Sequence, residues 1–257
     1  MKYLLVIARY KDYRQEFFEK HISPRNKEYC ALHGYEYIEI TDELQPIRGK
    51  LGWIKPFKIQ ELMNSILKDG DIITCFDADI AIVQMDKEFI PSDGKSFAYA
   101  IDSGNTHCMG AYSIRVNEWS RKMIDLMVSE ERYATLGNVI TQHERFKHHS
   151  SFWQEFYDQA SWYSLAGIKR HSDESFWNLP NNGWHTDTNE HTVYSLKELE
   201  QHVDLLPTPW NVTEMPGESS CEFNINKCKP NDVILRHFAG GQLWREKWLH
   251  ATVTHNG

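Results

Sequence analysis

Short hydrophobic runs alternate with longer amphipathic stretches over residues 1–85. Residues 3–8 form an apolar run that ends at Arg9-Tyr10, and residues 72–76 form a second run that leads directly into two aspartates. Continuous apolar runs of this length are typical of strands that are buried on both faces of a parallel sheet. Between them, residues 35–40 alternate polar and apolar side chains and predict a further strand.

Two stretches with helical periodicity separate these strands. Residues 12–33 carry apolar side chains at helical spacing, with Pro24 at a fresh helix start and Gly34 where a helix-ending residue is expected. After a loop at residues 41–52, a second helix is predicted at residues 56–68. The order strand, helix, strand, helix, strand predicts a Rossmann-like parallel sheet with right-handed crossovers. In such sheets, ligands collect beyond the carboxyl ends of the strands.

The second half of the chain has a less regular pattern. No repeat, low-complexity tract or linker divides it from the first half, so we expect one domain that spans residues 1–257. The predicted elements are strands at residues 97–101, 110–115, 203–206 and 232–238, helices at residues 118–132 and 151–165, and a loop at residues 171–192.

Charge and composition limit the classes of ligand. The formal net charge of −8 argues against general nucleic-acid binding, which needs a broad basic surface. An anionic nucleotide would therefore need a bound cation and a few placed Arg or Lys residues. Aromatic residues make up 13% of the chain. Aromatic rings line many sugar-binding clefts and also fill hydrophobic cores, so their number leaves both uses open.

The cysteines and the lengths of the hydrophobic runs indicate the cellular compartment of the protein. Five cysteines occur without a Cys-x-x-Cys pair, and Cys75 lies inside an apolar run. We expect reduced thiols, with Cys75 buried, and nothing demands that Cys221 and Cys228 pair. The N-terminal apolar run is too short for a signal-peptide core, and no stretch approaches the length of a membrane span. These features predict a cytoplasmic protein.

The segment Asp77-Ala78-Asp79 follows the second apolar run directly. Hard divalent cations such as Mn²⁺ and Mg²⁺ prefer oxygen ligands, which two carboxylates at the end of a buried strand can supply. Such an ion would neutralise the charge of a departing diphosphate. Alternate positions of an extended chain point to opposite sides, so a local bend is needed for both carboxylates to face one ion. Solvated carboxylates in a turn are the alternative interpretation.

A histidine ends the last predicted strand, in Val233-Ile234-Leu235-Arg236-His237-Phe238-Ala239-Gly240-Gly241. A ring nitrogen of His237 is a candidate third metal ligand, and Gly240 would let the backbone pass close to phosphate oxygens. Downstream, Arg245 and Lys247 are candidates to hold a diphosphate. A core histidine beside a turn and a solvated helix face are the corresponding alternatives.

Several short motifs occur in a fixed order: Asn26-Lys27-x-Tyr29, His33-Gly34-Tyr35, Trp53-x-Lys55-Pro56, Phe76-Asp77-Ala78-Asp79-Ile80 and, later, His237-Phe238-Ala239-Gly240. In this order the chain resembles glycosyltransferase family 34, the galactosyl- and xylosyltransferase-like family with the GT-A fold. The resemblance covers residues 3–85 well and is loose in the middle of the chain. It implies an α/β GT-A fold with a Rossmann-like mixed sheet flanked by helices. Residues 1–100 would bind the nucleotide, and residues 101–257 the donor sugar and the acceptor.

The resemblance further implies a retaining transferase that uses a UDP-sugar donor and Mn²⁺, or Mg²⁺ in its place. Asp77, Asp79 and His237 would be the metal ligands. Where the family has Asn-x-Gly, this chain has Met109-Gly110, so the polar contact of that Asn with the donor sugar is in question. The implied contacts to the nucleotide sugar come from Ala8, Arg9, Tyr10, Lys55, Asp77, Ala78, Asp79, Gly110, Gly240, Arg245 and Lys247.

The pair Asp158-Gln159 matches an Asp-Gln pair that the family carries in a later helix. Retention proceeds either by double displacement on a carboxylate nucleophile or by a front-face route, in which a polar group steadies the sugar cation. We expect the front-face route, with Gln159 as the stabiliser and Asp158 as a ligand of a sugar hydroxyl. A solvated helix pair is the alternative for both.

The carbohydrate or glycoconjugate acceptor has its own candidate residues. Trp210 and Asn211 stand where the family has an aromatic-Asn pair near the acceptor. Trp184 lies in a polar, Asn-rich loop and either forms a platform for the acceptor or packs within its loop.

Other functions remain open from the sequence. An inverting nucleotide-sugar transferase or a donor hydrolase could use Asp158 as a general base, and the stereochemistry of the product distinguishes them. A catalytically silent carbohydrate-binding module would bind sugar without Mn²⁺, which the set of Asp77, Asp79 and His237 argues against. A Rossmann oxidoreductase is disfavoured, because no glycine-rich turn follows the first strand. Galactose, glucose and xylose donors differ so little that pocket shape must choose among them.

Overall fold

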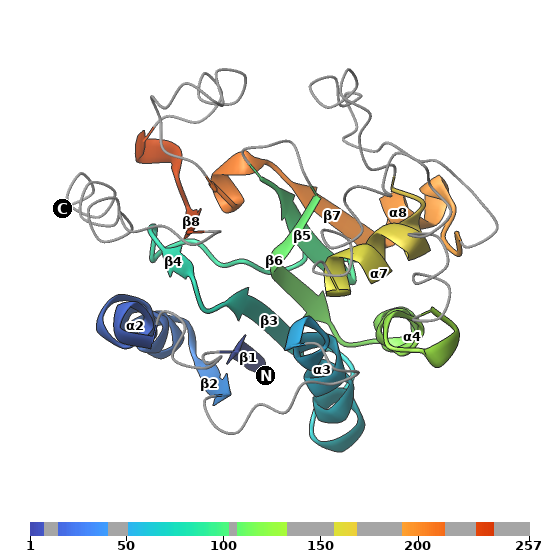
Figure 1. Ribbon diagram of the computed structural model, residues 1–257, viewed down its shortest axis with the longest axis horizontal. Helices are drawn as coiled ribbons and strands as arrows, with labels where there is room; N and C mark the ends of the chain where they lie inside the picture. The colour runs from blue at the N-terminus through green and yellow to red at the C-terminus, as the bar shows by residue number, and fades with distance from the viewer. Residues whose placement is uncertain are drawn as a thin grey trace.

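The structure, a computed structural model, describes residues 1–7, 15–40, 51–102, 107–132, 157–168, 192–213 and 230–238. A sheet of six strands crosses the molecule in the order β2-β1-β3-β6-β5-β7 (Figure 1). Its strands are β1 (Lys2–Ile7), β2 (Tyr35–Ile40), β3 (Ile72–Asp77), β5 (Phe97–Ile101), β6 (His107–Arg115) and β7 (Val203–Leu206). The sheet is mixed, because β6 runs antiparallel to both of its neighbours while the other pairs of strands are parallel.

Helices cover both faces of this sheet (Figure 1). They are α2 (Ser23–His33), α3 (Ile54–Ser65), α4 (Glu118–Met127), α7 (Tyr157–Ala166) and α8 (Leu196–His202). Strand β1 lies between β2 and β3 and pairs in parallel with both, which confirms the alternation predicted for the first part of the chain.

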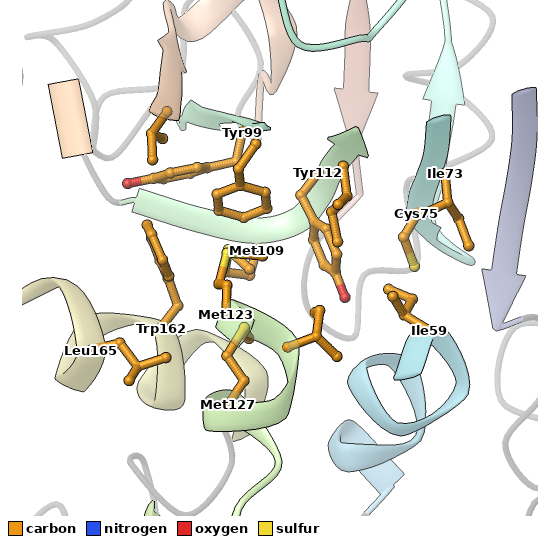
Figure 2. Close-up of a cluster of buried hydrophobic side chains, with 14 of the residues drawn as sticks. Ile59, Ile73, Cys75, Tyr99, Met109, Tyr112, Met123, Met127, Trp162 and Leu165 are labelled. Atoms are coloured by element: carbon orange, nitrogen blue, oxygen red, sulfur yellow. The ribbon is translucent and has the colours of Figure 1, made fainter. Parts of the chain in front are cut away.

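The side chains of β1 enter two separate cores. Tyr3 and Leu5 pack with residues of α3, α4 and α7, whereas Leu4 and Val6 pack with residues of α2. Because side chains alternate between the faces of a strand, burial on both faces accounts for the uninterrupted apolar run. Figure 2 shows the first core, where Trp162 of α7 lies against the sheet.

The helix predicted at residues 12–33 is divided in the structure. Among the described residues it consists of α1 (Gln15–Phe17), a π-helical turn (Phe18–Ile22) and α2. Pro24 has no N–H to donate to the preceding turn and its ring crowds the carbonyl four residues back, which accounts for the wider turn before it. Gly34 ends α2 as predicted, with φ of 71° and its N–H donating to Cys30 O.

Helix α3 begins at Ile54 and ends at Ser65, earlier at both ends than the predicted range of 56–68. A 3-10 turn (Leu51–Trp53) precedes it within the predicted loop. The earlier start places Lys55 in the first turn of α3, close to the carboxyl end of β3.

Boundaries also differ in the second half. Strand β6 begins at His107, ahead of the predicted residues 110–115. Helix α4 ends at Met127, before the predicted end at residue 132. The Ser129 Oγ accepts a hydrogen bond from the Arg132 N–H at 3.1 Å, so a new N-cap divides the predicted helix. Helix α8 was not predicted, although its capping box of Ser195 and Glu198 is visible in the sequence.

A second, two-stranded sheet joins distant parts of the chain. Strand β4 (Ile80–Ile82) pairs antiparallel with β8 (Leu235–His237), and β8 is shorter than the predicted strand at residues 232–238. Arg25 of α2 supports β4 from outside, because its Nε donates to Ile82 O at 2.7 Å. This sheet sets the position of the site described below.

Among the described residues, every helix is too short or too polar to cross a membrane. The thiols of Cys30, Cys75 and Cys108 are free and buried, which confirms the prediction for Cys75. Cys221 and Cys228 lie outside the described residues.

Candidate metal and donor site

The carboxyl end of β3 carries both aspartates of the acidic motif. Asp77 is the last residue of β3, Ala78 and Asp79 form a turn, and β4 begins at Ile80. This turn supplies the bend that an extended Asp-x-Asp segment lacks, so both carboxylates reach one site. The Asp79 carbonyl oxygen accepts a hydrogen bond from the Phe238 N–H at 2.9 Å, which ties the turn to the end of β8.

Strand β8 brings His237 to the same turn. His237 lies opposite Ile80 in the β4–β8 ladder, and its N–H donates to Val212 O at 2.9 Å. His237 Nε2 lies 3.5 Å from Asp79 Oδ1. One possible ligand atom from each of Asp77, Asp79 and His237 lies within 4.8 Å of the other two. The structure therefore brings together the three residues that the sequence predicted as metal ligands.

Gly110 lets the backbone of β6 pass directly beside these groups. A Cβ at Gly110 would lie 2.5 Å from Cε1 of the His237 ring and 3.1 Å from Oδ2 of Asp77. No side chain fits at the shorter distance, so the close approach requires glycine. The structure thus places Gly110 against the metal ligands, and its predicted contact with the donor sugar stays a prediction.

Lys55 connects Asp77 of the acidic motif to Asp158 of α7. Its Nζ lies 2.7 Å from Asp77 Oδ1, 3.0 Å from Asp158 Oδ2 and 2.8 Å from Met109 O. Its ammonium also lies 5.3 Å from the centre of the Tyr112 ring, within the range of a cation–π contact. The Lys55 side chain is buried, so the sequence-predicted donor contact of Lys55 would need atoms that already have partners in the protein.

The first turn of α7 presents the predicted catalytic pair to this region. The Asp158 Oδ1 accepts a hydrogen bond from the Gln159 N–H at 2.9 Å. The Gln159 Oε1 accepts one from the Met109 N–H at 3.1 Å. Both side chains are buried, which rules out the alternative of a solvated helix pair.

Burial and neighbouring charges shift the proton affinities of these groups. Burial lowers the pKa of Lys55, but the carboxylates of Asp158 and Asp77 outweigh it and hold that pKa well above its usual value. Burial raises the pKa of Asp158 and Asp77 adds to this rise, whereas Lys55 opposes it. Burial also lowers the pKa of His237, but Asp79 and Cys108 more than compensate and raise it well above the usual value.

Cys108 is a site residue that the sequence analysis missed. Its Sγ lies 3.8 Å from His237 Nδ1, on the side of the ring away from Asp79. A metal-binding histidine commonly donates its second ring N–H to a neighbouring group, which fixes the ring and its tautomer. The sequence offers no signal for this contact, because Cys108 and His237 meet only through the fold.

The three ligands suit a divalent transition metal. Two carboxylates and one imidazole form a mixed oxygen and nitrogen donor set, which fits Mn²⁺ better than Mg²⁺ because Mg²⁺ strongly prefers oxygen. The side chain of Asp77 is 36% exposed, whereas those of Asp79 and His237 are 11% and 8% exposed. A ligand of a bound metal ion would therefore approach from the side of Asp77.

The predicted acceptor residues have different surroundings. The ring of Trp210 is partly buried in the core of the α2 face, with its centre 5.5 Å from that of Phe89. Asn211 is fully buried, and within the described part of the chain its side-chain amide makes no hydrogen bond. Ala78 also packs against the same core. These surroundings do not show whether the residues contact an acceptor or a donor. The acceptor roles of Trp210 and Asn211 and the donor role of Ala78 therefore stay predictions.

Several predicted site residues fall outside the described residues. They are Ala8, Arg9, Tyr10, Trp184, Gly240, Arg245 and Lys247.

No protein-family model matches the chain, and no curated protein matches its sequence. Solved structures do match it. A glycosyltransferase involved in the glycosylation of the major capsid of PBCV-1 aligns over 98% of this chain and 98% of its own, with TM-score 0.52 and 13% identity. The glycosyltransferase GlyE of Streptococcus pneumoniae aligns over 98% of this chain and 61% of its own, with TM-score 0.47 and 12% identity. The galactosyltransferase LgtC aligns over 99% of this chain and 96% of its own, with TM-score 0.44 and 9% identity.

The first of these similarities extends over nearly the whole of both chains. Together with the mixed sheet and its flanking helices, it shows that this chain has the predicted α/β fold of the GT-A glycosyltransferases. Membership in glycosyltransferase family 34 stays a prediction.

Proposed function

We propose that the protein is a retaining, Mn²⁺-dependent glycosyltransferase that moves a hexose or a pentose from a UDP-sugar to a carbohydrate or glycoconjugate acceptor. One observation supports this most directly: three buried or partly buried side chains that could hold a metal ion meet at the carboxyl end of β3. Ligands bind at this edge in sheets of this type.

In this proposal, the metal ion positions the diphosphate of the donor. A bound Mn²⁺ would offset negative charge on the diphosphate as it leaves the sugar. Asp77, Asp79 and His237 would hold the ion, with Asp77 on the side that is open to the donor. Residues of this chain would thereby fix the position of the diphosphate relative to α7.

Retention requires the acceptor hydroxyl to attack the face from which the diphosphate leaves. In the front-face route, the sugar bond to the diphosphate breaks as the bond to the acceptor oxygen forms, and the acceptor proton moves to a diphosphate oxygen. This route needs a polar group beside the sugar cation and no protein nucleophile. Gln159 suits this role, because the Met109 N–H fixes its side-chain amide at the edge of the metal site.

Calorimetry with UDP, with and without Mn²⁺, tests the donor site. We expect binding of UDP to wild type to depend on Mn²⁺ and to be lost in Asp79→Ala. Asp86→Ala is the matched control, since Asp86 is exposed and lies just beyond β4. Binding that ignores the metal ion, or equal binding by wild type and Asp79→Ala, would contradict the proposal.

The stereochemistry of the product tests retention. A screen of UDP-galactose, UDP-glucose and UDP-xylose against simple saccharides identifies a donor and an acceptor, and proton NMR reads the anomeric configuration of the new glycosidic linkage. We expect the product to keep the configuration of the donor. An inverted product would instead favour an inverting transferase with a general base.

A further inference from the structure

The buried ion pair between Lys55 and Asp158 lies between the metal ligands and Gln159. We propose that Lys55 and Asp158 form one positioning unit, which orients Asp77 and Gln159 and contributes no group to the reaction itself. The inference rests on the proposed function, because the residues that it positions belong to the proposed transferase. It replaces the expectation that Asp158 binds a sugar hydroxyl and that Lys55 binds the donor.

The Lys55 ammonium is enclosed by acceptors of the protein, two of them through hydrogen bonds and the third through an ion pair. An ammonium group has three N–H donors. Three acceptors surround Nζ: Asp77 Oδ1 at 2.7 Å, Met109 O at 2.8 Å and Asp158 Oδ2 at 3.0 Å. The residue is 7% exposed. A phosphate or sugar oxygen would have to displace one of these partners to bind Lys55.

The carboxylate of Asp158 is similarly engaged. Oδ1 accepts from the Gln159 N–H at 2.9 Å, and Oδ2 forms an ion pair with the Lys55 ammonium at 3.0 Å, without the geometry of a hydrogen bond. A nucleophile needs an oxygen that faces the anomeric carbon, and a general base needs one that faces the acceptor hydroxyl. Both oxygens of Asp158 face protein donors instead, and the residue is 7% exposed.

Two contacts transmit the position of this pair to the proposed reacting centre. On one side, Lys55 takes Oδ1 of Asp77, which leaves Oδ2, the oxygen beside Gly110, for the metal ion. On the other side, the two peptide groups of Met109 link Lys55 to Gln159: its carbonyl accepts from Lys55 and its N–H donates to the Gln159 amide. A shift of the Lys55 ammonium therefore displaces both a metal ligand and the proposed stabiliser.

The charges of the site support the same role. Asp77, Asp79 and Asp158 carry three negative charges and Lys55 carries one positive charge, so two negative charges remain for one divalent cation to balance. Removal of one partner of a buried ion pair leaves the other charge uncompensated, whereas removal of both restores the balance between them. This difference makes a double-mutant cycle the suitable test.

The cycle consists of Lys55→Met, Asp158→Asn and the double variant, with Lys58→Met as the control. Asp158→Asn keeps the shape of the side chain and the acceptor for the Gln159 N–H. We expect Asp158→Asn to lower kcat by about 10- to 100-fold, the size of effect that a misplaced group produces. The dissociation constant of the UDP–Mn²⁺ complex should change less than about threefold, because Lys55 keeps its hydrogen bonds to Asp77 and Met109 in this variant. Lys58 lies one turn along α3 in an exposed pair with Glu61, so Lys58→Met should leave both quantities unchanged.

The double variant gives the decisive comparison. If the pair acts as one unit, adding Asp158→Asn to Lys55→Met recovers part of kcat and of the stability that Lys55→Met loses. Additive losses would overturn the inference. So would a loss above about 10⁴-fold in Asp158→Asn alone, which is the size expected for a removed nucleophile or base. Restored turnover of Asp158→Ala by sodium azide, with a sugar azide as product, would identify Asp158 as a nucleophile and would also overturn it.

Urea unfolding of the four metal-free variants separates this inference from the proposed function. The coupling between Lys55 and Asp158 in stability does not depend on any substrate, so it is measured even in a protein that transfers no sugar. A wild type that binds no UDP with Mn²⁺ would overturn the proposed function, whether or not the pair is coupled. An active wild type whose variants show no coupling would overturn the inference alone.

Discussion

The hydrogen of Gly110 occupies a place where any side chain would collide with a metal ligand. Gly110→Ala would put a Cβ 2.5 Å from Cε1 of His237, so the ring must move away from Asp77 and Asp79. We expect Mn²⁺ affinity, measured by calorimetry, to fall by at least about tenfold, as it does when the support of a metal ligand is disturbed.

Gly94→Ala is the matched control for this substitution. Gly94 has φ of 82° and open space around its Cβ position, so alanine strains only the backbone. We expect a loss of about 1 kcal/mol in the free energy of unfolding and unchanged Mn²⁺ affinity. Equal Mn²⁺ affinity of Gly110→Ala and wild type would show that the ring of His237 does not bind the ion in this position.

Cys108 contacts the ring nitrogen of His237 that does not face Asp79. Cys108→Ala removes this contact, and we expect Mn²⁺ affinity to fall by about tenfold. Cys108→Ser keeps an acceptor and should retain most of the affinity. Cys30→Ala removes another buried thiol, in α2, and should have no effect on the metal. A Cys108→Ala protein that binds Mn²⁺ as wild type does would assign the orientation of His237 to other contacts.

At this scale the sequence predicted the three clustered residues better than it predicted the contacts that support them. Asp77 ends a buried strand, Asp79 follows it closely and His237 ends another, and this local pattern was sufficient to predict residues that the fold brings together. The partners of Lys55 and the contact of Cys108 with His237 join residues that are far apart in the chain. No local pattern encodes such contacts, because they arise only when separate elements pack.

Elements with strong hydrophobic patterns were predicted well. Strands β2, β5 and β7 have the predicted boundaries, β3 is one residue longer at its end, and β1 is shifted by one residue at both ends. Helix α8 was missed because Leu199 is its one buried residue, so it has almost no apolar periodicity. Helix ends in α3 and α4 depend on turns and caps rather than on hydrophobic period, which explains why their predicted boundaries were wrong.

The N-terminus of α8 gives a prediction for pH. The Glu198 carboxylate accepts hydrogen bonds from the N–H and the hydroxyl of Ser195, and these lower its pKa in the folded state. A lowered pKa means that Glu198 stabilises the fold above the unfolded-state value of about 4.3, and that this contribution is lost as the pH falls through the folded-state pKa. We expect Glu198→Ala to be less stable than wild type in urea unfolding at pH 7, with a difference that shrinks toward pH 3. A difference that is constant with pH would contradict this assignment.

At the scale of the whole molecule, the metal ligands tie the main sheet to the small sheet of β4 and β8. Ligands that bind only the folded state raise its stability by about 2.7 kcal/mol at a concentration one hundred times their dissociation constant. We therefore expect UDP with Mn²⁺ to raise the melting temperature of wild type by about 5–10 °C, and EDTA to reverse the rise. Asp79→Ala should show no rise, whereas Asp86→Ala should respond as wild type does. A rise with UDP alone would place the nucleotide away from the acidic motif.

The pairing of β4 with β8 also has a consequence for how the protein matures. Asp79 precedes and His237 follows most of the strands and helices that the structure describes, so the ligand set is complete only after a very long loop has closed. Closing such a loop is slow compared with local folding. The central strands can therefore assemble while the site is still unable to hold an ion. The appearance of tight Mn²⁺ binding during refolding would then report when the last long-range contact forms. Chains that have not yet paired β4 with β8 would have a folded central sheet but would not bind the metal ion.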